Sequence, residues 1–181
     1  MSRKLQTQYW DAGVFCSFFN ASFEPARAAI VRELLKEAEA GGIKIVTSTV
    51  SLVEVLKVDW QHPLTKASED KIAAFFEKPY ISLIGADRLI CEIAGQLIWK
   101  YAALEYKDAI HLASAIQYSR RAKLDALFAW DKDFTKLNGK IDAPFPIYEP
   151  FIDQPSLESW ANQQPAALPP VPDTPKTDEK T

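Results

Sequence analysis

Four acidic residues that lie far apart along the chain have the side-chain type and the positions expected of a metal site. Each stands where an apolar run ends or where a predicted helix begins: Asp11, Glu54, Asp108 and Asp131. Carboxylates gathered at the ends of strands can hold a divalent ion against a phosphate group. The residue types therefore suggest phosphate-ester chemistry before any fold is considered.

Phosphodiester hydrolysis needs an activated water, a polarised phosphate and a stabilised leaving oxygen, and two divalent ions about 4 Å apart can supply all three. Magnesium prefers oxygen ligands, with water and substrate completing its coordination. Zinc would require His or Cys at ligand spacing, and the chain has only His62 and His111. A carboxylate set without such a cluster predicts Mg²⁺ or Mn²⁺ as the cofactor.

Each acid also has an ordinary structural alternative. Asp11 precedes Ala-Gly and can cap a helix. Glu54 can lie on a solvated helix face, and Asp108 can complement a helix dipole. Asp131 can form a turn or a cap, and Asp133 competes for its role. Each signal alone is weak, and the joint pattern carries the metal-site hypothesis.

Two further polar residues are candidates for auxiliary roles. His111 lies three residues after Asp108, on the same predicted helix face, where it can hydrogen-bond the carboxylate, contact substrate or simply pack in the core. Ser48 lies six residues before Glu54 at a predicted strand end. It can position a water or a phosphate, or serve as an N-cap.

Composition indicates a globular protein with a substantial core. The chain has 181 residues, of which 48% are apolar, and its formal net charge is −3, so no broad basic footprint for nucleic acid is visible. A small basic cluster, Arg120, Arg121 and Lys123, can hold a nucleic-acid backbone or can be a solvated helix end.

The expected location is the cytoplasm, because no signal peptide is recognised and no apolar run approaches the roughly 20 residues that span a bilayer. No contact with a membrane is expected. Cys16 and Cys91 lie far apart in apolar surroundings and are expected to be buried, reduced thiols.

Hydrophobic periodicity predicts strands alternating with helices, which favours an α/β fold with a parallel sheet. Strands are predicted over 5–10, 43–47, 80–84 and 125–130, with a short fifth at 147–148. Helices are predicted over 14–19, 24–40, 65–77, 87–104 and 107–121, and a further helix, capped by Ser48 or Thr49, carries Leu52, Val53, Val55 and Leu56. In such sheets ligands bind at the carboxyl ends of the strands, and this arrangement places Asp11 and Asp131 at such ends.

The chain divides by composition into a body, residues 1–152, and a tail, residues 153–181. Pro155 to Thr181 holds six of the twelve prolines together with Gln, Thr, Lys and Asp. A segment of this kind buries too little apolar surface to order itself, so a largely disordered tail is expected.

Four segments, in order and spacing, resemble the PIN domain (the PilT N-terminus family of nucleases). They are Tyr9-Trp10-Asp11-Ala12, Thr47-Ser48 with Glu54 six residues after Ser48, the run from Lys107 to Ala115, and Trp130-Asp131-Lys132-Asp133-Phe134. The similarity covers roughly residues 5 to 150. One departure is Gly13, where the family often carries Ser, Thr or Asn.

The resemblance implies a three-layer α/β/α fold with a central, mainly parallel sheet and an acidic pocket that binds Mg²⁺ or Mn²⁺. It implies a metal-dependent endoribonuclease acting on RNA, often the toxin paired with an antitoxin protein in a VapC-type system, and a possible homodimer. Asp11, Glu54, Asp108 and Asp131 occupy the four acidic positions, and Ser48 matches a polar pocket position. Two alternatives are a PIN-like module that binds RNA or protein without cutting, and a phosphatase acting on small phosphate esters.

Overall fold

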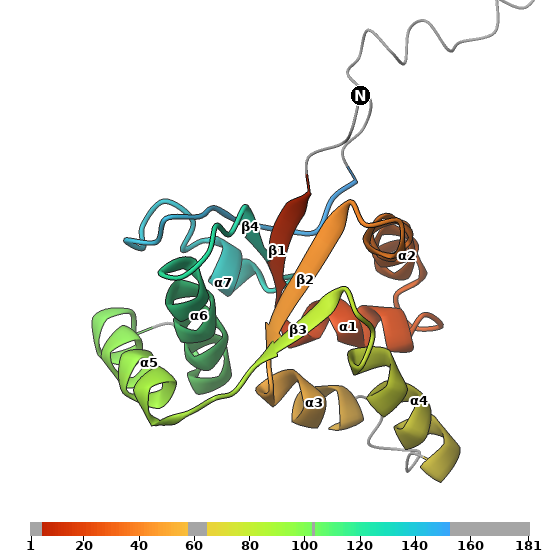
Figure 1. The fold of residues 1–181 in the computed structure, drawn as a ribbon. Helices are drawn as coiled ribbons and strands as arrows, with labels where there is room; N and C mark the ends of the chain where they lie inside the picture. Colours follow the sequence, from red (N-terminus) through yellow and green to blue (C-terminus); the bar gives the residue numbers. More distant parts are fainter. Residues whose placement is uncertain (1–4, 58–64, 103, 153–181) are drawn as a thin grey trace, which may run out of the picture.

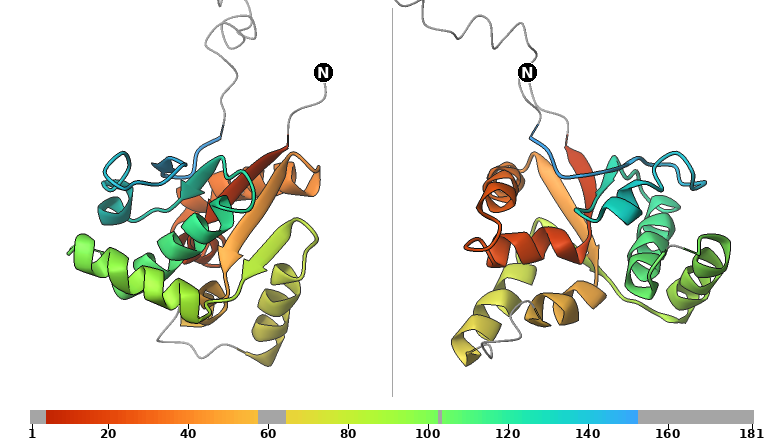
Figure 2. Two further views of the ribbon diagram at one scale, coloured as in Figure 1. Left: turned by 60° about the vertical axis from the view of Figure 1, so that its left-hand side comes forward. Right: turned by 180° about the vertical axis from the view of Figure 1, so that it is seen from behind.

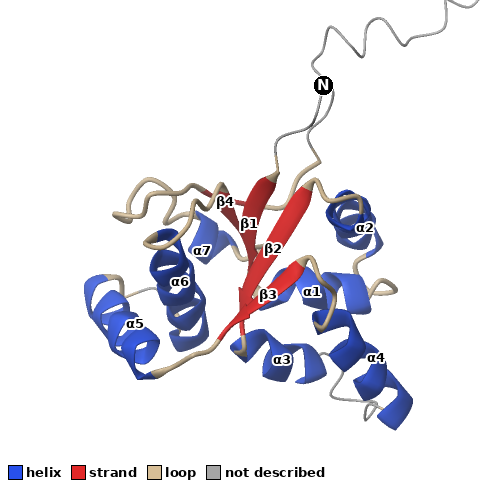
Figure 3. Cartoon of the chain, viewed as in Figure 1, coloured by secondary structure: helices blue, strands red, loops and turns tan. Residues whose placement is uncertain are grey.

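A five-stranded parallel sheet forms the centre of the molecule, in a computed structural model that describes residues 5–57, 65–102 and 104–152. The strand order is β3-β2-β1-β4-β5, and every adjacent pair is parallel. The strands are β1 (Gln6–Trp10), β2 (Ile43–Ser48), β3 (Ile81–Ile84), β4 (Ala126–Phe128) and β5 (Ile147–Tyr148). β1 therefore lies in the middle, between β2 and β4, and Figure 3 shows the strands enclosed by helices.

Helices cover both faces of this sheet, as the two views in Figure 2 show. One face packs against α1 (Ala12–Phe19), α2 (Pro25–Glu39) and α4 (Lys66–Phe76); the other packs against α5 (Arg88–Lys100), α6 (Tyr106–Ser119) and α7 (Lys132–Thr135). α3 (Val50–Glu54) and a 3-10 turn, η1 (Val55–Lys57), follow β2 at the end of the sheet to which the arrowheads point in Figure 1. The three-layer α/β/α prediction is confirmed.

Alternation along the strands divides the core into two halves. Tyr9, Val46 and Leu127 face α5 and α6, whereas Trp10 and Phe128 face α1 and α2. All five are almost completely buried. Since both faces are covered, consecutive residues of β1, β2 and β4 are buried, as expected for a parallel sheet, although β1 and β2 also contain polar residues.

The structure corrects several element boundaries. The predicted helix to Leu104 ends at Lys100, and the predicted strand 125–130 contains only Ala126–Phe128. α3 is a single short turn, and α7 was not predicted. The prediction of a disordered tail concerns residues 153–181, which lie outside the described residues.

The prediction of two buried thiols was partly wrong. Cys16 is half-buried and Cys91 is exposed, and both are free thiols. Burial raises the pKa of the Cys16 thiol to about 12. Within the described part of the chain, none of the helices is long and apolar enough to cross a membrane.

Candidate active site

Asp11 lies at the carboxyl end of the central strand, next to the point where the strand order reverses. Its backbone N–H donates to Phe128 O at 2.9 Å, which ties the end of β1 to the end of β4. Its side chain caps α1 by accepting from Gly13 N at 3.2 Å. The residue is only 8% exposed. The predicted cap is therefore present, and a buried carboxylate stands at the topological switch point where open α/β sheets bind ligands.

His111, which lies on α6, contacts two of the carboxylates predicted for the site. Its Nε2 lies 2.9 Å from Glu54 Oε2 and 3.4 Å from Asp11 Oδ1, and its Nδ1 lies 2.9 Å from the Tyr9 hydroxyl. The ring is fully buried. The hydrogen bond to a carboxylate was among the predicted roles, but the partner is Glu54 from α3 and not Asp108 from the same helix.

The charge of this ring follows from its carboxylate neighbours. Burial lowers the pKa of His111, but the charge of Asp11 and the hydrogen bond to Glu54 outweigh burial and hold it above its usual value. In the imidazolium form both ring nitrogens carry a proton, so the ring can donate to Glu54 and to the Tyr9 oxygen. Burial also raises the pKa of Asp11, which the charge of His111 opposes.

Glu54 is held on both of its oxygens. Oε2 contacts His111, and Oε1 lies 3.2 Å from Lys107 Nζ. The Glu54 side chain is 17% exposed, so the solvated helix face is not observed. Burial raises the pKa of this carboxyl, but the bonds from His111 and Lys107 outweigh burial and place the pKa below its usual value.

Asp108 lies in the first turn of α6, and among the residues that the structure describes no lysine or arginine forms an ion pair with it. Burial, followed by the negative charges of Asp11 and Asp131, raises its pKa to about 7, although the charge of His111 opposes the rise. The carboxylates that follow β1 and β4 are therefore near enough to the Asp108 carboxylate for their negative charges to act on it. Repulsion of this kind is relieved by a bound cation.

Asp131 is the N-cap of α7, with Oδ1 accepting from Asp133 N at 2.6 Å and from Phe134 N at 3.3 Å. It is exposed. Asp133, the competing candidate, is also exposed and pairs with Lys136 at 2.6 Å. Its side chain is thus engaged by a lysine of the same short helix segment.

Hydroxyl side chains line the end of β2. Ser48 is fully buried, and its Oγ accepts from Val50 N at 3.3 Å, although the N-cap residue of α3 is Thr49. Thr47 Oγ1 donates to Trp10 O at 2.7 Å and contacts Ser51 Oγ at 2.7 Å. These bonds fix β2 to the end of β1. In the sequence Thr47 appeared only within the Thr47-Ser48 segment and Ser51 was not singled out, because the contacts of both hydroxyls depend on the fold.

The predicted basic cluster is remote from the carboxylates. Arg120, Arg121 and Lys123 are exposed and belong to the connection from the end of α6 to the start of β4. That connection lies at the amino edge of the parallel sheet, opposite Asp11. The cluster therefore does not line the acidic site.

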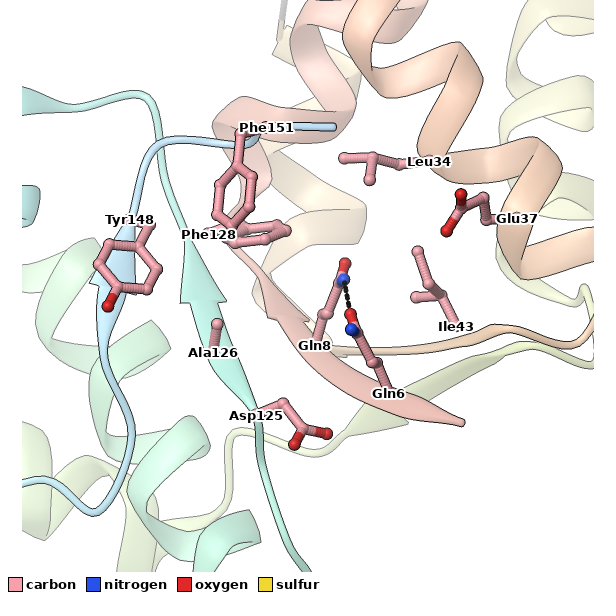
Figure 4. A pocket seen from close by; sticks show the side chains of 10 residues that line it. All are labelled: Gln6, Gln8, Leu34, Glu37, Ile43, Asp125, Ala126, Phe128, Tyr148 and Phe151. Atoms are coloured by element: carbon pink, nitrogen blue, oxygen red, sulfur yellow. Dashed lines mark hydrogen bonds between the residues drawn. The ribbon is translucent and has the colours of Figure 1, made fainter. Parts of the chain in front are cut away.

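A pocket of about 220 Å³ lies beside the sheet on the side covered by α2. Figure 4 shows its lining residues around the start of β1, with Gln6 and Gln8 joined by a hydrogen bond of 3.2 Å. Glu37 and Asp125 stand at its margin and Tyr148 and Phe151 at its aromatic side. None of the predicted site residues borders it, so the acids of the carboxyl edge form a separate feature.

The donor set fits a hard divalent cation. Carboxylate oxygens from Asp11, Asp108 and Asp131, with Glu54 beside them, match the ligands that Mg²⁺ and Mn²⁺ prefer. Across residues 5–57, 65–102 and 104–152, no three acidic, His or Cys side chains already converge as a finished metal centre. Burial and the charges of Asp11 and Asp131 raise the pKa of Asp108, and a bound cation would relieve the repulsion between these charges.

Comparison with known proteins places this arrangement in a family. The family model of the PIN domain matches residues 9–140. No curated protein matches the chain by sequence.

Three solved structures share the fold. A toxin–antitoxin complex from Klebsiella pneumoniae is 21% identical, with a TM-score of 0.53 over 80% of this chain and 98% of that one. VapC20 from Mycobacterium tuberculosis, a toxin that cleaves the sarcin–ricin loop, is 18% identical, with a TM-score of 0.54 over 71% and 93%. VapBC2 from Rickettsia felis, bound to a promoter DNA fragment, is 13% identical, with a TM-score of 0.54 over 80% and 98%.

Proposed function

We propose that this chain, which belongs to the PIN domain family, is an endoribonuclease that hydrolyses RNA phosphodiester bonds with Mg²⁺ or Mn²⁺. The single observation that carries the proposal is the group of carboxylates at the end of β1, in which burial and then the charges of Asp11 and Asp131 raise the pKa of Asp108 to about 7. Asp11 and Asp131 also cap helices, but capping does not require that their charges lie near Asp108. Acids grouped in this way can hold a cation against a phosphate.

Asp11, Asp108 and Asp131 are proposed to hold the metal. When bound, the ion polarises the phosphate and lowers the pKa of the attacking water. Glu54 binds the ion or accepts a proton from the attacking water and orients it. His111 positions Glu54 and Asp11 through the contacts at 2.9 and 3.4 Å.

Ser48 and Asp133 keep auxiliary roles in this proposal. Ser48 is buried at the end of β2, where it supports the turn that leads to Glu54. Asp133 is exposed beside the α7 cap and can contact substrate once it leaves Lys136.

The chain is also proposed to be the toxin of a toxin–antitoxin pair, a hypothesis supported by the fold it shares with the Klebsiella and Rickettsia proteins. An antitoxin would insert an Arg or Lys among the carboxylates, because such a cation neutralises clustered negative charge. Metal affinity should then fall on antitoxin binding. An RNA substrate and two free thiols fit a cytoplasmic location. A homodimer remains a prediction from the family resemblance.

A non-catalytic module that binds RNA or protein is the main alternative. A scaffold does not need an acid such as Asp108, whose pKa is raised to about 7 by burial and by the charges of Asp11 and Asp131. A phosphatase for small esters is less well supported, because the residues after Asp11 are Ala and Gly and leave no second Asp for a nucleophile pair. A chromogenic phosphate ester tests that alternative directly.

The deciding experiment is cleavage of a panel of structured and single-stranded RNAs by wild type and Asp11→Asn in EDTA, Mg²⁺ or Mn²⁺. The nuclease predicts cutting that requires metal and falls on the order of 100-fold or more in the variant. Equal cutting by a folded Asp11→Asn protein would remove Asp11 from the site. Metal binding without cutting of any RNA would favour the binding module.

A further inference from the structure

Lys107 stands beside the acidic site without belonging to the predicted metal-ligand set. It follows Tyr106 in the first turn of α6 and directly precedes Asp108. Its Nζ lies 3.2 Å from Glu54 Oε1, and its side chain is 42% exposed while that of Glu54 is 17% exposed. The amine therefore sits on the solvent side of the carboxylate, where a chain approaching the site would meet it.

Stability does not require this pair. Glu54 is already anchored by fully buried His111 at 2.9 Å. An ion pair with a half-exposed lysine contributes only about 0–1 kcal/mol. Lys107 can leave this contact at a small cost in free energy, because its long side chain reaches a new partner by rotating about its own bonds.

RNA binding, in contrast, requires positive charge at this place. Asp11, Glu54, Asp108 and Asp131 carry up to four negative charges, and a phosphodiester adds another. The predicted basic cluster at Arg120, Arg121 and Lys123 lies at the far edge of the sheet and cannot offset them locally. The ammonium of Lys107, which directly precedes Asp108, can offset these charges, because it donates hydrogen bonds to phosphate oxygens and moves on a flexible side chain.

We propose that Lys107 is an RNA-contacting residue that rests on Glu54 in the free protein and transfers its ammonium to a backbone phosphate oxygen when RNA enters the acidic site. This inference rests on the proposed function. It assigns the residue to substrate binding and leaves metal binding to the carboxylates. No covalent bond changes in the transfer, which exchanges one charge-assisted hydrogen bond for another.

The test compares wild type, Lys107→Met and Lys107→Arg, with Lys36→Met as the matched control. Lys36 is an exposed lysine paired with Glu33 at 2.6 Å in the last turn of α2, away from the site. Binding of a fluorescent single-stranded RNA is measured in EDTA, where no cutting occurs, across a series of salt concentrations. Mn²⁺ affinity without RNA is measured by calorimetry, and thermal unfolding reports folding.

Loss of one phosphate contact should weaken RNA binding several-fold in Lys107→Met and lower the slope of log K against log salt by about 0.7. Lys107→Arg should keep both values near wild type, and Mn²⁺ affinity should not fall in either. In the cleavage assay the Met variant should raise KM more than it lowers kcat.

Equal slopes for Lys107→Met and Lys36→Met would overturn the inference while leaving the nuclease intact, provided that wild type cuts RNA. A loss of Mn²⁺ affinity in Lys107→Met would also overturn it, since Lys107 would then act by organising the carboxylates. If wild type neither binds nor cuts any RNA, the proposed function fails together with the inference.

Discussion

The two edges of the parallel sheet both carry acidic side chains, but the acids are surrounded differently. At the amino edge, Asp125 accepts from Thr7 N at 2.8 Å and pairs with Lys123. At the carboxyl edge, Asp108 faces Asp11 and Asp131, and its pKa rises to about 7. At the amino edge, the carboxylate accepts a backbone hydrogen bond and forms an ion pair. The other edge gathers carboxylates at a cost to the metal-free fold, and it is the edge at which we propose the active site.

The largest expected effect separates the edges by activity. Asp108→Asn should reduce metal-dependent RNA cleavage on the order of 100-fold or more, because it removes a charged ligand from the site. Asp125→Asn, the matched change at the amino edge, should leave cleavage within about twofold. Initial rates in Mn²⁺ measure both. Similar losses in the two variants would mean that the distinction between the edges is false.

The next effect concerns the histidine that links the site to the core. His111→Ala should lower the free energy of unfolding by roughly 3 kcal/mol, because it leaves Glu54 and the Tyr9 hydroxyl without their buried partner. Urea denaturation measures the change, with Gln117→Ala on the same helix as control. A decrease of less than about 1 kcal/mol in the free energy of unfolding would show that water replaces the hydrogen bonds of the ring with little loss.

Replacing Asp by Asn should change the free energy of unfolding in opposite directions at the two edges. Without metal at pH 8, Asp108→Asn should stabilise the fold by roughly 1 kcal/mol, a value reduced from the full pKa shift to allow for solvent screening. Asp125→Asn should destabilise it by about 1 kcal/mol, because its bond to Thr7 N and its pair with Lys123 are weakened. Chemical denaturation in EDTA gives both signs, and a destabilised Asp108→Asn protein would contradict the repulsion.

The pH dependence follows from the same shift. A carboxyl whose pKa is about 7 in the folded protein and 3.8 ordinarily binds a proton more readily when folded. Its contribution to stability therefore increases as pH falls from 8 through 7 and levels off below about 4. Mn²⁺ should bind more weakly below pH 7 and release a proton on binding near pH 7. Calorimetry in buffers of different ionisation enthalpy detects that proton, and Asp108→Asn should abolish it.

The smallest effect tests how tightly the carboxyl edge is packed. A Cβ at Gly13 would lie 3.2 Å from Asp11 Oδ2, whereas a Cβ at Gly95 in α5 meets nothing within 4 Å. Gly95→Ala should stabilise the protein by roughly 0.5–1 kcal/mol with unchanged Mn²⁺ affinity. Gly13→Ala should change stability by less than about 0.5 kcal/mol, because displacement of Asp11 offsets the helix gain, and should weaken Mn²⁺ binding a few-fold. Equal Mn²⁺ affinity in both would show that Asp11 moves freely.

Local sequence patterns were sufficient for most of the fold. Apolar residues at helical spacing predicted α2 as residues 24–40, against Pro25–Glu39 in the structure. The β-branched run at Ile43 predicted β2, and the placement of Asp11 at a strand end follows from the apolar run before it. These features are local, so the chain's own periodicity expresses them.

Features that depend on contacts between distant segments were missed. The bond between His111 and Glu54 spans 57 positions and replaces the expected bond to Asp108. The ion pair of Lys107 with Glu54 joins α6 to α3, and no periodic pattern in the sequence indicates it. α7 is only four residues long, too short for a hydrophobic pattern, and depends on the Asp131 cap. The roles proposed for the four acids remain predictions.

The bond between Asp11 N and Phe128 O also determines when the site can exist during synthesis. β1 is made early, and its neighbour β4 is made more than a hundred residues later, so the carboxylates cannot meet until most of the body has been translated. Contacts of such long sequence separation form late, because a large loop must close first. If the chain cuts RNA as proposed, a nascent copy is harmless to the message and ribosome that produce it until β4 has emerged and joined β1.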